Sequence, residues 1–329
     1  MRALHYHETG KPREVLRLED IPSPTPGRGE VLVRVTHRSL NPADLNVIMG
    51  SYSKLPDLPA VGGNEGAGYV DQLGDGVEGL AAGQRVVLMG ARGTWQEEVV
   101  VPAEACLPIP DGVSDEDAAQ LFVNPLTAVL MLDELDLPDG AWLLQTAGTS
   151  QVGRIVVQLA RQRGLRTISL VRRSDADTLL EALGADEVVV ADVEADTRTV
   201  RSRVMELTDG RGASGAFDAV AGRIGGLATR CLAEGATMLV YGGLSGNPLA
   251  VDAGTFIFRN ITVRGFWRTG WFDRHPLVET RARLAPLVDM VASGELRLPV
   301  AAAYDLADFS EAIAHSRQPG TEGKVLLTG

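Results

Sequence analysis

Hydrophobic and polar residues alternate in short runs through about the first 115 residues of the chain. The clearest run is EVLVRVTHRSL at 30–40, which alternates and is rich in β-branched residues, as expected for a half-buried strand. Clusters of Gly and Pro, such as IPSPTPGRG and GDGVEGLAAGQ, separate this run from others like it. Short strands separated in this way predict a compact β-rich domain, with one short helix at NPADLNVIMG.

The pattern then changes, and a helix is predicted over SDEDAAQLFVNPLTAVLMLDEL, with Ser114 as its N-cap and Pro125 bending or dividing it. Strands and helices alternate after it, beginning with the strand AWLLQTA and the helix QVGRIVVQLARQRG. This rhythm predicts a parallel, doubly wound sheet. Two amphipathic helices and a strand, GKVLLTG, end the chain. We therefore expect an α/β protein with a β-rich domain from 1–115 and 266–329 and a dinucleotide-binding domain from 116–265.

Composition narrows the class of protein. A length of 329 residues is typical of about two domains. The formal net charge is −12, which disfavours nucleic acid or an anionic membrane as the main partner. The two cysteines, Cys106 and Cys231, are too few for a disulfide framework, and we expect reduced thiols in or near the core. The N-terminal segment does not resemble a signal peptide, and no apolar run approaches the roughly 20 residues of a membrane span, so a cytoplasmic location is expected.

A candidate phosphate-binding loop, AGTSQVG at 147–153, lies between the first predicted strand and helix of the α/β domain. A dinucleotide needs a tight turn there, close backbone approach, and a helix N-terminus facing its pyrophosphate. The loop departs from GxGxxG because Ser150 and Gln151 stand where a second glycine is common. The alternative is a turn that binds no ligand. The expected nucleotide-binding residues are Gly148, Thr149, Ser150, Gln151, Val152 and Gly153.

Two further turns bear on the cofactor. The next predicted strand ends at Arg172 and Arg173, where NAD sites place an acidic residue, and two guanidinium groups suit the 2′-phosphate of NADPH instead. The alternative is a solvated arginine pair. In the later turn LVYGGLSG, Tyr241, Gly242 and Gly243 are expected to let the backbone pass close to the nicotinamide ribose, unless this is an ordinary glycine turn.

A β-rich domain followed by a Rossmann domain resembles the medium-chain dehydrogenase/reductase superfamily over essentially the whole chain. The resemblance implies that the β-rich domain is GroES-like and carries the catalytic and substrate-binding residues. Zinc members take metal ligands from C-x-x-D and G-H-E segments, and the matching positions here are Asn41 in NPAD and Asn64 in GGNEG. Carboxamides are poor replacements for thiolate and imidazole on zinc, so the resemblance implies a member without catalytic zinc.

Three stretches resemble the mitochondrial 2-enoyl thioester reductases: GSYSKLPDLPAVGGNEG at 50–66, VNPLTA at 123–128 and RGFWRTGW at 264–271. VNPLTA is also shared with quinone oxidoreductases. The family is zinc-free, uses NADPH, and saturates trans-2-enoyl thioesters of CoA or acyl carrier protein. A quinone or small-enone reductase on the same scaffold is the main alternative, and a non-catalytic NADPH-binding protein is a third.

The same resemblance implies residue roles. Tyr52 matches the family's catalytic tyrosine, which donates a proton or hydrogen bond to the enolate, although a tyrosine with no such role remains an alternative. Trp267 matches a tryptophan near substrate and nicotinamide, with Phe266 beside it. The alternative is that these two residues form an aromatic cluster on a core helix.

The remaining candidates are polar. Asn41 and Thr127 are implied along the nicotinamide, and Asn124 is a further polar candidate. Lys324 matches a basic position that approaches the cofactor, unless it is simply solvated. Glu65 is expected to support the site rather than act as a base, and Asn64 to be structural. A homodimer formed through the edges of the Rossmann sheets is also implied.

Overall fold

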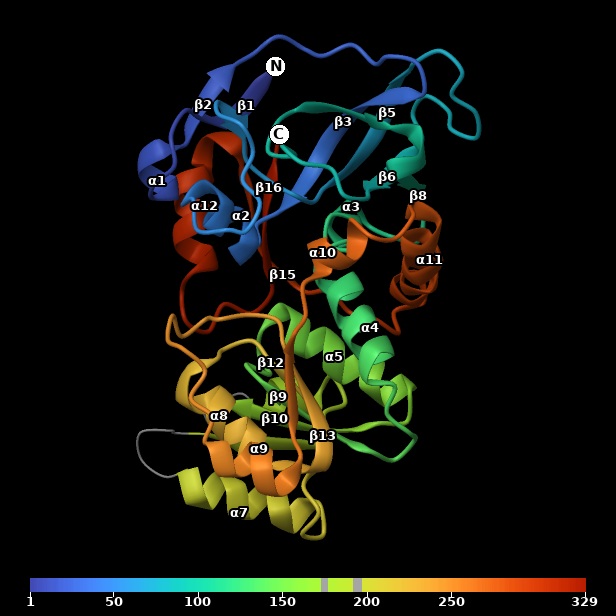
Figure 1. The fold of residues 1–329 in the computed structure, drawn as a ribbon. Coiled ribbons are helices and arrows are strands. Elements are labelled where there is room, and N and C mark those ends of the chain that lie inside the picture. Colours follow the sequence, from blue (N-terminus) through green and yellow to red (C-terminus); the bar gives the residue numbers. More distant parts are fainter. Residues whose placement is uncertain (173–176, 192–196) are drawn as a thin grey trace. The chain divides into compact units, whose positions relative to one another are not determined.

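The computed structural model describes residues 1–172, 177–191 and 197–329 (Figure 1). It divides into two compact units, one from Met1–Leu126 with Phe272–Gly329 and the other from Thr127–Trp271. Among the described residues, none of the helices combines the length and the hydrophobicity that a membrane span requires.

The first unit contains two sheets (Figure 1). A three-stranded sheet has the order β2-β1-β4, and a larger sheet has the order β15-β16-β3-β5-β6-β8, with β7 also paired to β3. The strands are β1 (Arg2–Tyr6), β2 (Arg17–Asp20), β3 (Glu30–Ser39), β4 (Ala60–Val61), β5 (Ala67–Leu73), β6 (Arg85–Leu88), β7 (Glu98–Pro102), β8 (Cys106–Pro108), β15 (Val300–Asp305) and β16 (Lys324–Thr328). The helices are α1 (Pro12–Val15), α2 (Pro42–Ile48), α3 (Asp115–Ala118), α11 (Leu277–Ser293) and α12 (Phe309–Ser316).

Strand β3 organises this unit. It occupies the run predicted at 30–40 and pairs with β5, β7 and β16, all antiparallel. Val31, Val33 and Val35 enter a buried core with Val86 and Leu88 of β6. The pairing with β16 brings the end of the chain into the sheet of the first unit.

The predicted short helix is α2, and its start is stabilised locally. Asn41 is the N-cap, Pro42 occupies the first turn, and the Asp44 carboxylate accepts a hydrogen bond from the Asn41 backbone N–H. The Asp44 N–H donates to the Asn41 carbonyl oxygen at 3.0 Å, so the start of the helix is closed by one side-chain and one backbone hydrogen bond with the spacing of a capping box.

The second unit is a doubly wound parallel sheet, as predicted. Its strand order is β11-β10-β9-β12-β13-β14, and every neighbouring pair is parallel. The strands are β9 (Trp142–Thr146), β10 (Arg166–Val171), β11 (Glu187–Val190), β12 (Ala213–Asp218), β13 (Leu232–Val240) and β14 (Thr262–Gly265). The helices are α4 (Asn124–Leu135, which begins in the first unit), α5 (Gln151–Gln162), α6 (Asp177–Glu181), α7 (Thr197–Leu207), α8 (Gly222–Arg230), α9 (Ala253–Arg259) and α10 (Arg268–Phe272, whose last residue lies in the first unit).

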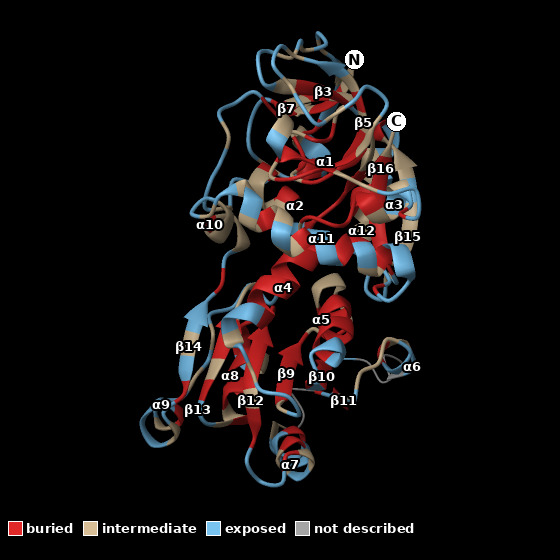
Figure 2. Cartoon of the chain, turned by 90° about the vertical axis from the view of Figure 1, so that its right-hand side faces the viewer, coloured by how far each residue is buried: buried red, intermediate tan, exposed pale blue. Residues whose placement is uncertain are grey.

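Burial within this sheet decreases toward one edge. The central strand β9 is buried throughout, whereas β14 at the edge is largely exposed (Figure 2). Helix α5 packs seven consecutive buried residues after Gly153, and β9 and α5 together hold the loop between them in place.

Candidate functional site

The predicted phosphate loop has the expected strand–loop–helix context. Strand β9 ends at Thr146, and α5 begins at Gln151 after Ser150, whose Oγ accepts a hydrogen bond from the Gly153 N–H at 3.1 Å. The backbone N–H groups of the first turn of α5 therefore converge at a helix N-terminus, which is an arrangement that favours an anionic phosphate.

Glycine is required at both outer positions of this loop. A Cβ at Gly148 would lie 2.7 Å from Ser169 Cβ, and a Cβ at Gly153 would lie 2.6 Å from the Gly148 carbonyl oxygen. These distances are far below van der Waals contact, so the close approach of the loop to β10 and of α5 to the loop depends on the missing side chains. The residue types that suggested a dinucleotide loop in the sequence thus have a structural reason.

The third predicted turn approaches the phosphate loop. Tyr241 follows β13 and is hydrogen-bonded to Ser150, and burial of the phenol is the main reason why its pKa is raised. A Cβ at Gly242 would lie 2.7 Å from the Ala219 carbonyl oxygen, whereas Gly243 has open space around it. The structure therefore brings Ser150 and Tyr241 together and gives Gly242 a packing role that Gly243 lacks.

One residue of this region was not anticipated from the sequence. Asp218, at the end of β12, is fully buried and accepts hydrogen bonds from Thr146 Oγ1 at 2.7 Å and from the backbone N–H groups of Val220 and Ala221. It ties the carboxyl ends of β9 and β12 together beneath the loops. Its place directly after a buried strand was a usable signal.

The structure describes only one of the two predicted cofactor-binding arginines. Arg172 is exposed and follows directly after the last residue of β10, whereas Arg173 lies outside the described residues. Within the sheet, Leu170 is paired with Thr146 of β9, and the Gly148 N–H approaches the Leu170 carbonyl oxygen. Arg172 therefore lies at the same edge of the sheet as the phosphate loop.

The predicted aromatic pair follows β14. The Phe266 N–H donates to the Val240 carbonyl oxygen at 2.8 Å, which places Phe266 beside the start of the Tyr241 turn. Phe266 is buried, and Trp267 is 37% exposed. The Trp267 indole lies over Gly270, where a Cβ would be 2.6 Å from the ring. Trp267 thus packs on the short helix α10 and still keeps part of its ring accessible.

In the first unit, five side chains form what we call the buried charge cluster, in which all but the half-buried Asn64 are buried: Asn41, Asp44, Asn64, Glu65 and Lys324. Asn41 Nδ2 donates to Glu65 Oε2 at 3.0 Å, and Lys324 Nζ donates to Asn41 Oδ1. Asn64 Nδ2 donates to Asp44 Oδ1 at 2.6 Å. Lys324 is only 3% exposed, so the alternative of a solvated lysine is wrong.

Burial controls the protonation of this cluster. It raises the pKa of Asp44 to about 6, although the hydrogen bonds from Asn41 and Asn64 and the charge of Lys324 act in the opposite direction. Burial also lowers the pKa of Lys324, while the charges of Glu65 and Asp44 raise it. The buried cation therefore favours the ionised form of both carboxylates, whereas the Glu65 charge opposes ionisation of Asp44, in a region from which water is largely excluded.

Glu65 also reaches the chain segment before α4. Its Oε1 accepts the Val123 N–H at 2.6 Å, so the carboxylate links Asn41 to the residue before Asn124. This agrees with the supporting role expected for Glu65. Asn124 and Thr127 are both buried and lie three residues apart on α4, which places them on one side of that helix.

The donor set at the positions that bind zinc in zinc-dependent family members does not fit zinc. Asn41 directs its amide oxygen to the ammonium of Lys324, and Asn64 directs its amide nitrogen to Asp44. A divalent ion bound through Asn41 would meet a buried positive charge, and amide groups are weak zinc ligands. No catalytic step through a metal follows from these residues.

Tyr52 lies in the segment between α2 and β4 and is half-buried. The start of this segment is held against α2, because the Ser51 N–H donates to the Asn46 carbonyl oxygen at 2.9 Å. Further along the segment, Lys54 forms an ion pair with Asp273. Of the predicted catalytic and cofactor-binding residues that the structure describes, Asn41, Tyr52, Asn124 and Lys324 belong to the first unit, and the others belong to the second.

Comparisons with known proteins agree with this arrangement. Residues 27–111 match the family model of the alcohol dehydrogenase GroES-like domain, and residues 152–285 match that of the zinc-binding dehydrogenase. The second match carries zinc in its name but excludes both Asn41 and Asn64. A GroES-like unit and a Rossmann sheet with such a loop define an oxidoreductase that uses a nicotinamide cofactor.

Individual relatives narrow the family. The chain is 34% identical to the human mitochondrial enoyl-[acyl-carrier-protein] reductase, over 100% of this chain and 88% of that protein. It is 32% identical to a structure from Bacillus thuringiensis described as an NADPH:quinone reductase, with a TM-score of 0.92 over 100% of this chain and 98% of that one. It is 30% identical to a mycobacterial protein solved with NADPH, with a TM-score of 0.89 over 100% of both chains. The chain belongs to the medium-chain dehydrogenase/reductase superfamily, in the group that includes enoyl reductases and quinone reductases.

Proposed function

We propose that this protein uses NADPH to reduce the C2=C3 double bond of trans-2-enoyl thioesters of CoA or acyl carrier protein. The observation that carries the proposal is the buried charge cluster, whose donor set is unsuited to the zinc that would polarise a simple alcohol or carbonyl. A substrate for such a site must already be polarised, as an enoyl thioester is. The similarity to an enoyl reductase over the whole chain favours the thioester.

The proposed chemistry assigns roles to this chain's residues. Bound NADPH would supply a hydride to Cβ, which leaves negative charge on the thioester oxygen as an enolate. The Tyr52 phenol is proposed either to stabilise that oxygen by donating a hydrogen bond or to deliver, directly or through water, the proton that Cα takes up. Trp267 is proposed to border the substrate and the nicotinamide, with Phe266 beside it. Asn41 and Thr127 are proposed to lie along the nicotinamide, Lys324 to approach the cofactor, and Asn124 to be a further polar contact to it.

A substrate panel tests the proposal directly. NADPH oxidation is followed with crotonyl-CoA, a decenoyl-CoA, 1,4-benzoquinone and a small enone, and the thioesters are expected to give the higher kcat/KM. Quinone turnover with inactive thioesters would replace the proposal by the quinone reductase, which the Bacillus thuringiensis structure favours. Tight NADPH binding without turnover of any substrate would indicate a non-catalytic protein.

Arg172 is expected to determine cofactor preference. It is exposed at the carboxyl ends of the parallel strands, where the phosphate loop also lies, and its guanidinium can pair there with a 2′-phosphate. Arg172→Ala should raise KM for NADPH about tenfold, the effect of losing one charge-assisted hydrogen bond, and leave KM for NADH nearly unchanged. Arg211→Ala, which removes an exposed arginine paired with Asp209 in the same unit, is the matched control. Equal use of NADH and NADPH by the unaltered protein would contradict this role.

The homodimer implied by the family resemblance has a suitable surface. Strand β14 is the last strand of its sheet, and the neighbouring helix α9 exposes three apolar side chains: Phe256, Ile257 and Phe258. Exposed sheet edges and apolar patches favour association with another chain. We therefore propose that this edge forms the contact between two copies.

A further inference from the structure

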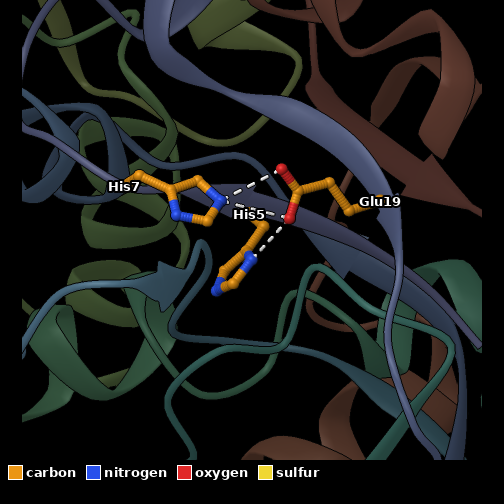
Figure 3. A group of neighbouring side chains, drawn as sticks. All are labelled: His5, His7 and Glu19. Carbon is orange, nitrogen blue, oxygen red and sulfur yellow. Dashed lines mark hydrogen bonds and ion pairs between the residues drawn. The ribbon is translucent and has the colours of Figure 1, made fainter.

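Two imidazoles and a carboxylate gather on the three-stranded sheet, in the first unit and outside the buried charge cluster (Figure 3). His5 lies on β1, His7 follows that strand, and Glu19 lies on β2. His5 Nδ1 is 2.8 Å from Glu19 Oε2, and His7 Nε2 is 3.1 Å from Glu19 Oε1. One ligand atom from each of the three residues lies within 4.8 Å of the other two.

The strand geometry explains the gathering. Residues two apart on a strand point to the same side, so His5 and His7 face together while Tyr6 between them is buried in the core. The antiparallel pairing of β1 with β2 sets His5 opposite Arg17 and brings Glu19 within reach. The Arg17 guanidinium is directed to backbone carbonyls rather than to the histidines.

The donor set suits a divalent transition metal. Imidazole nitrogens and a carboxylate oxygen are established zinc ligands, and two histidines with one glutamate leave coordination positions for water. With metal–ligand bonds of about 2.0–2.1 Å, tetrahedral geometry places ligand atoms roughly 3.3 Å apart. The spacings of His5 and His7 from Glu19 are close to this value. The ligand atoms lie within 4.8 Å of one another, so coordination requires the two imidazoles to move toward each other, and the more exposed His7 is the side chain with room to do so.

The three side chains also differ in solvent exposure, and this difference favours entry of an ion. The side chains of His5 and Glu19 are 15% and 33% exposed, and that of His7 is 59% exposed. The inner histidine is therefore held by packing, whereas the outer one leaves a path for an ion and its water ligands. We propose that His5, His7 and Glu19 bind one Zn²⁺ or a divalent transition-metal ion of similar preference, which links β1 to β2.

The test uses the full-length protein without a polyhistidine tag and titrates it with Zn²⁺ in a calorimeter and with Co²⁺ by visible absorption. We expect one equivalent to bind and Co²⁺ to give d–d bands of a site with nitrogen and oxygen ligands. His7→Gln and Glu19→Gln should each weaken binding about tenfold or more. The ion should raise the melting temperature of the unaltered protein but not of His7→Gln, because only a ligand of the native state stabilises it.

His275→Gln removes a histidine outside the cluster and is the matched control. It should bind as the unaltered protein does. Absence of binding, or binding that His7→Gln and Glu19→Gln leave unchanged, would overturn the proposal and reduce the cluster to a hydrogen-bonded group. Since the readouts are metal binding and melting temperature, the outcome is independent of whether the proposed reductase activity is found.

Discussion

Tyr52→Phe is expected to lower kcat for enoyl thioester reduction about 10²–10³-fold, with a much smaller change in KM, because positioned proton donors contribute on this scale. The substitution removes only the phenol oxygen and keeps the half-buried aromatic ring. A group that acts mainly on the enolate raises kcat rather than ground-state affinity. Steady-state kinetics with crotonyl-CoA and NADPH measure both parameters.

Tyr304→Phe is the control for this prediction. Tyr304 belongs to the same unit, is partly buried, and its phenol is hydrogen-bonded to His315 Nδ1 at 2.9 Å. Loss of this hydroxyl should leave kcat nearly unchanged. If Tyr52→Phe retains full thioester reduction, the donor role is wrong even where the substrate proposal holds. The substrate panel tests that proposal separately.

Lys324→Met is expected to destabilise the protein by about 3–5 kcal/mol at neutral pH, the usual effect of removing one partner from a buried ion pair. The variant leaves the carboxylates of Asp44 and Glu65 buried without their cation. Urea unfolding followed by tryptophan fluorescence measures the loss, and Trp95 reports on this unit because it is fully buried there.

The loss should depend on pH. The pKa of Asp44 in the folded protein, about 6, lies above its ordinary 3.8, so the folded state binds more protons between these values. Stability from this group therefore falls as pH rises through that window. Without the charge of Lys324, the pKa of Asp44 should rise further. The cost of Lys324→Met should then be larger at pH 8 than at pH 5, where Asp44 is protonated.

The double variant Lys324→Met with Asp44→Asn separates charge from packing. It removes one positive and one negative charge together, so the cluster keeps the net charge of the unaltered protein. It should be more stable at pH 8 than Lys324→Met alone. Equal instability of the single and double variants, or a cost of Lys324→Met that does not change with pH, would contradict the electrostatic explanation.

Local pattern predicted the fold well where one face of an element is buried. The alternation at 30–40 predicted β3, and the βα rhythm predicted the parallel sheet, because burial of one face imposes a period on the sequence. The helix predicted over SDEDAAQLFVNPLTAVLMLDEL is divided into α3 and α4. Between them, the Ala119 carbonyl oxygen accepts a hydrogen bond from Ser39 Oγ, and Gln120 Nε2 donates one to the Leu298 carbonyl oxygen. A local sequence pattern does not reveal such hydrogen bonds, because their partners are far apart in the chain.

The sequence predicted which types of residue form the candidate site better than it predicted which of them contact one another. The phosphate loop was found because its glycines and its helix follow a strand in sequence. The contact of Ser150 with Tyr241 and the role of Asp218 depend on the order of strands in the sheet, which places sequentially distant turns side by side.

By itself, the sequence determined the two kinds of architecture, the phosphate loop, and the presence of asparagine at the positions where zinc-dependent members of the family have metal ligands. Only the tertiary structure decided what those asparagines do. Lys324 is 283 residues from Asn41, and pairing of β16 with β3 buries its ammonium on the amide of Asn41. Glu19 joins His5 and His7 only because β1 and β2 pair. Local pattern records which face of an element is buried, whereas the partner of a buried charge depends on contacts between elements far apart in the chain.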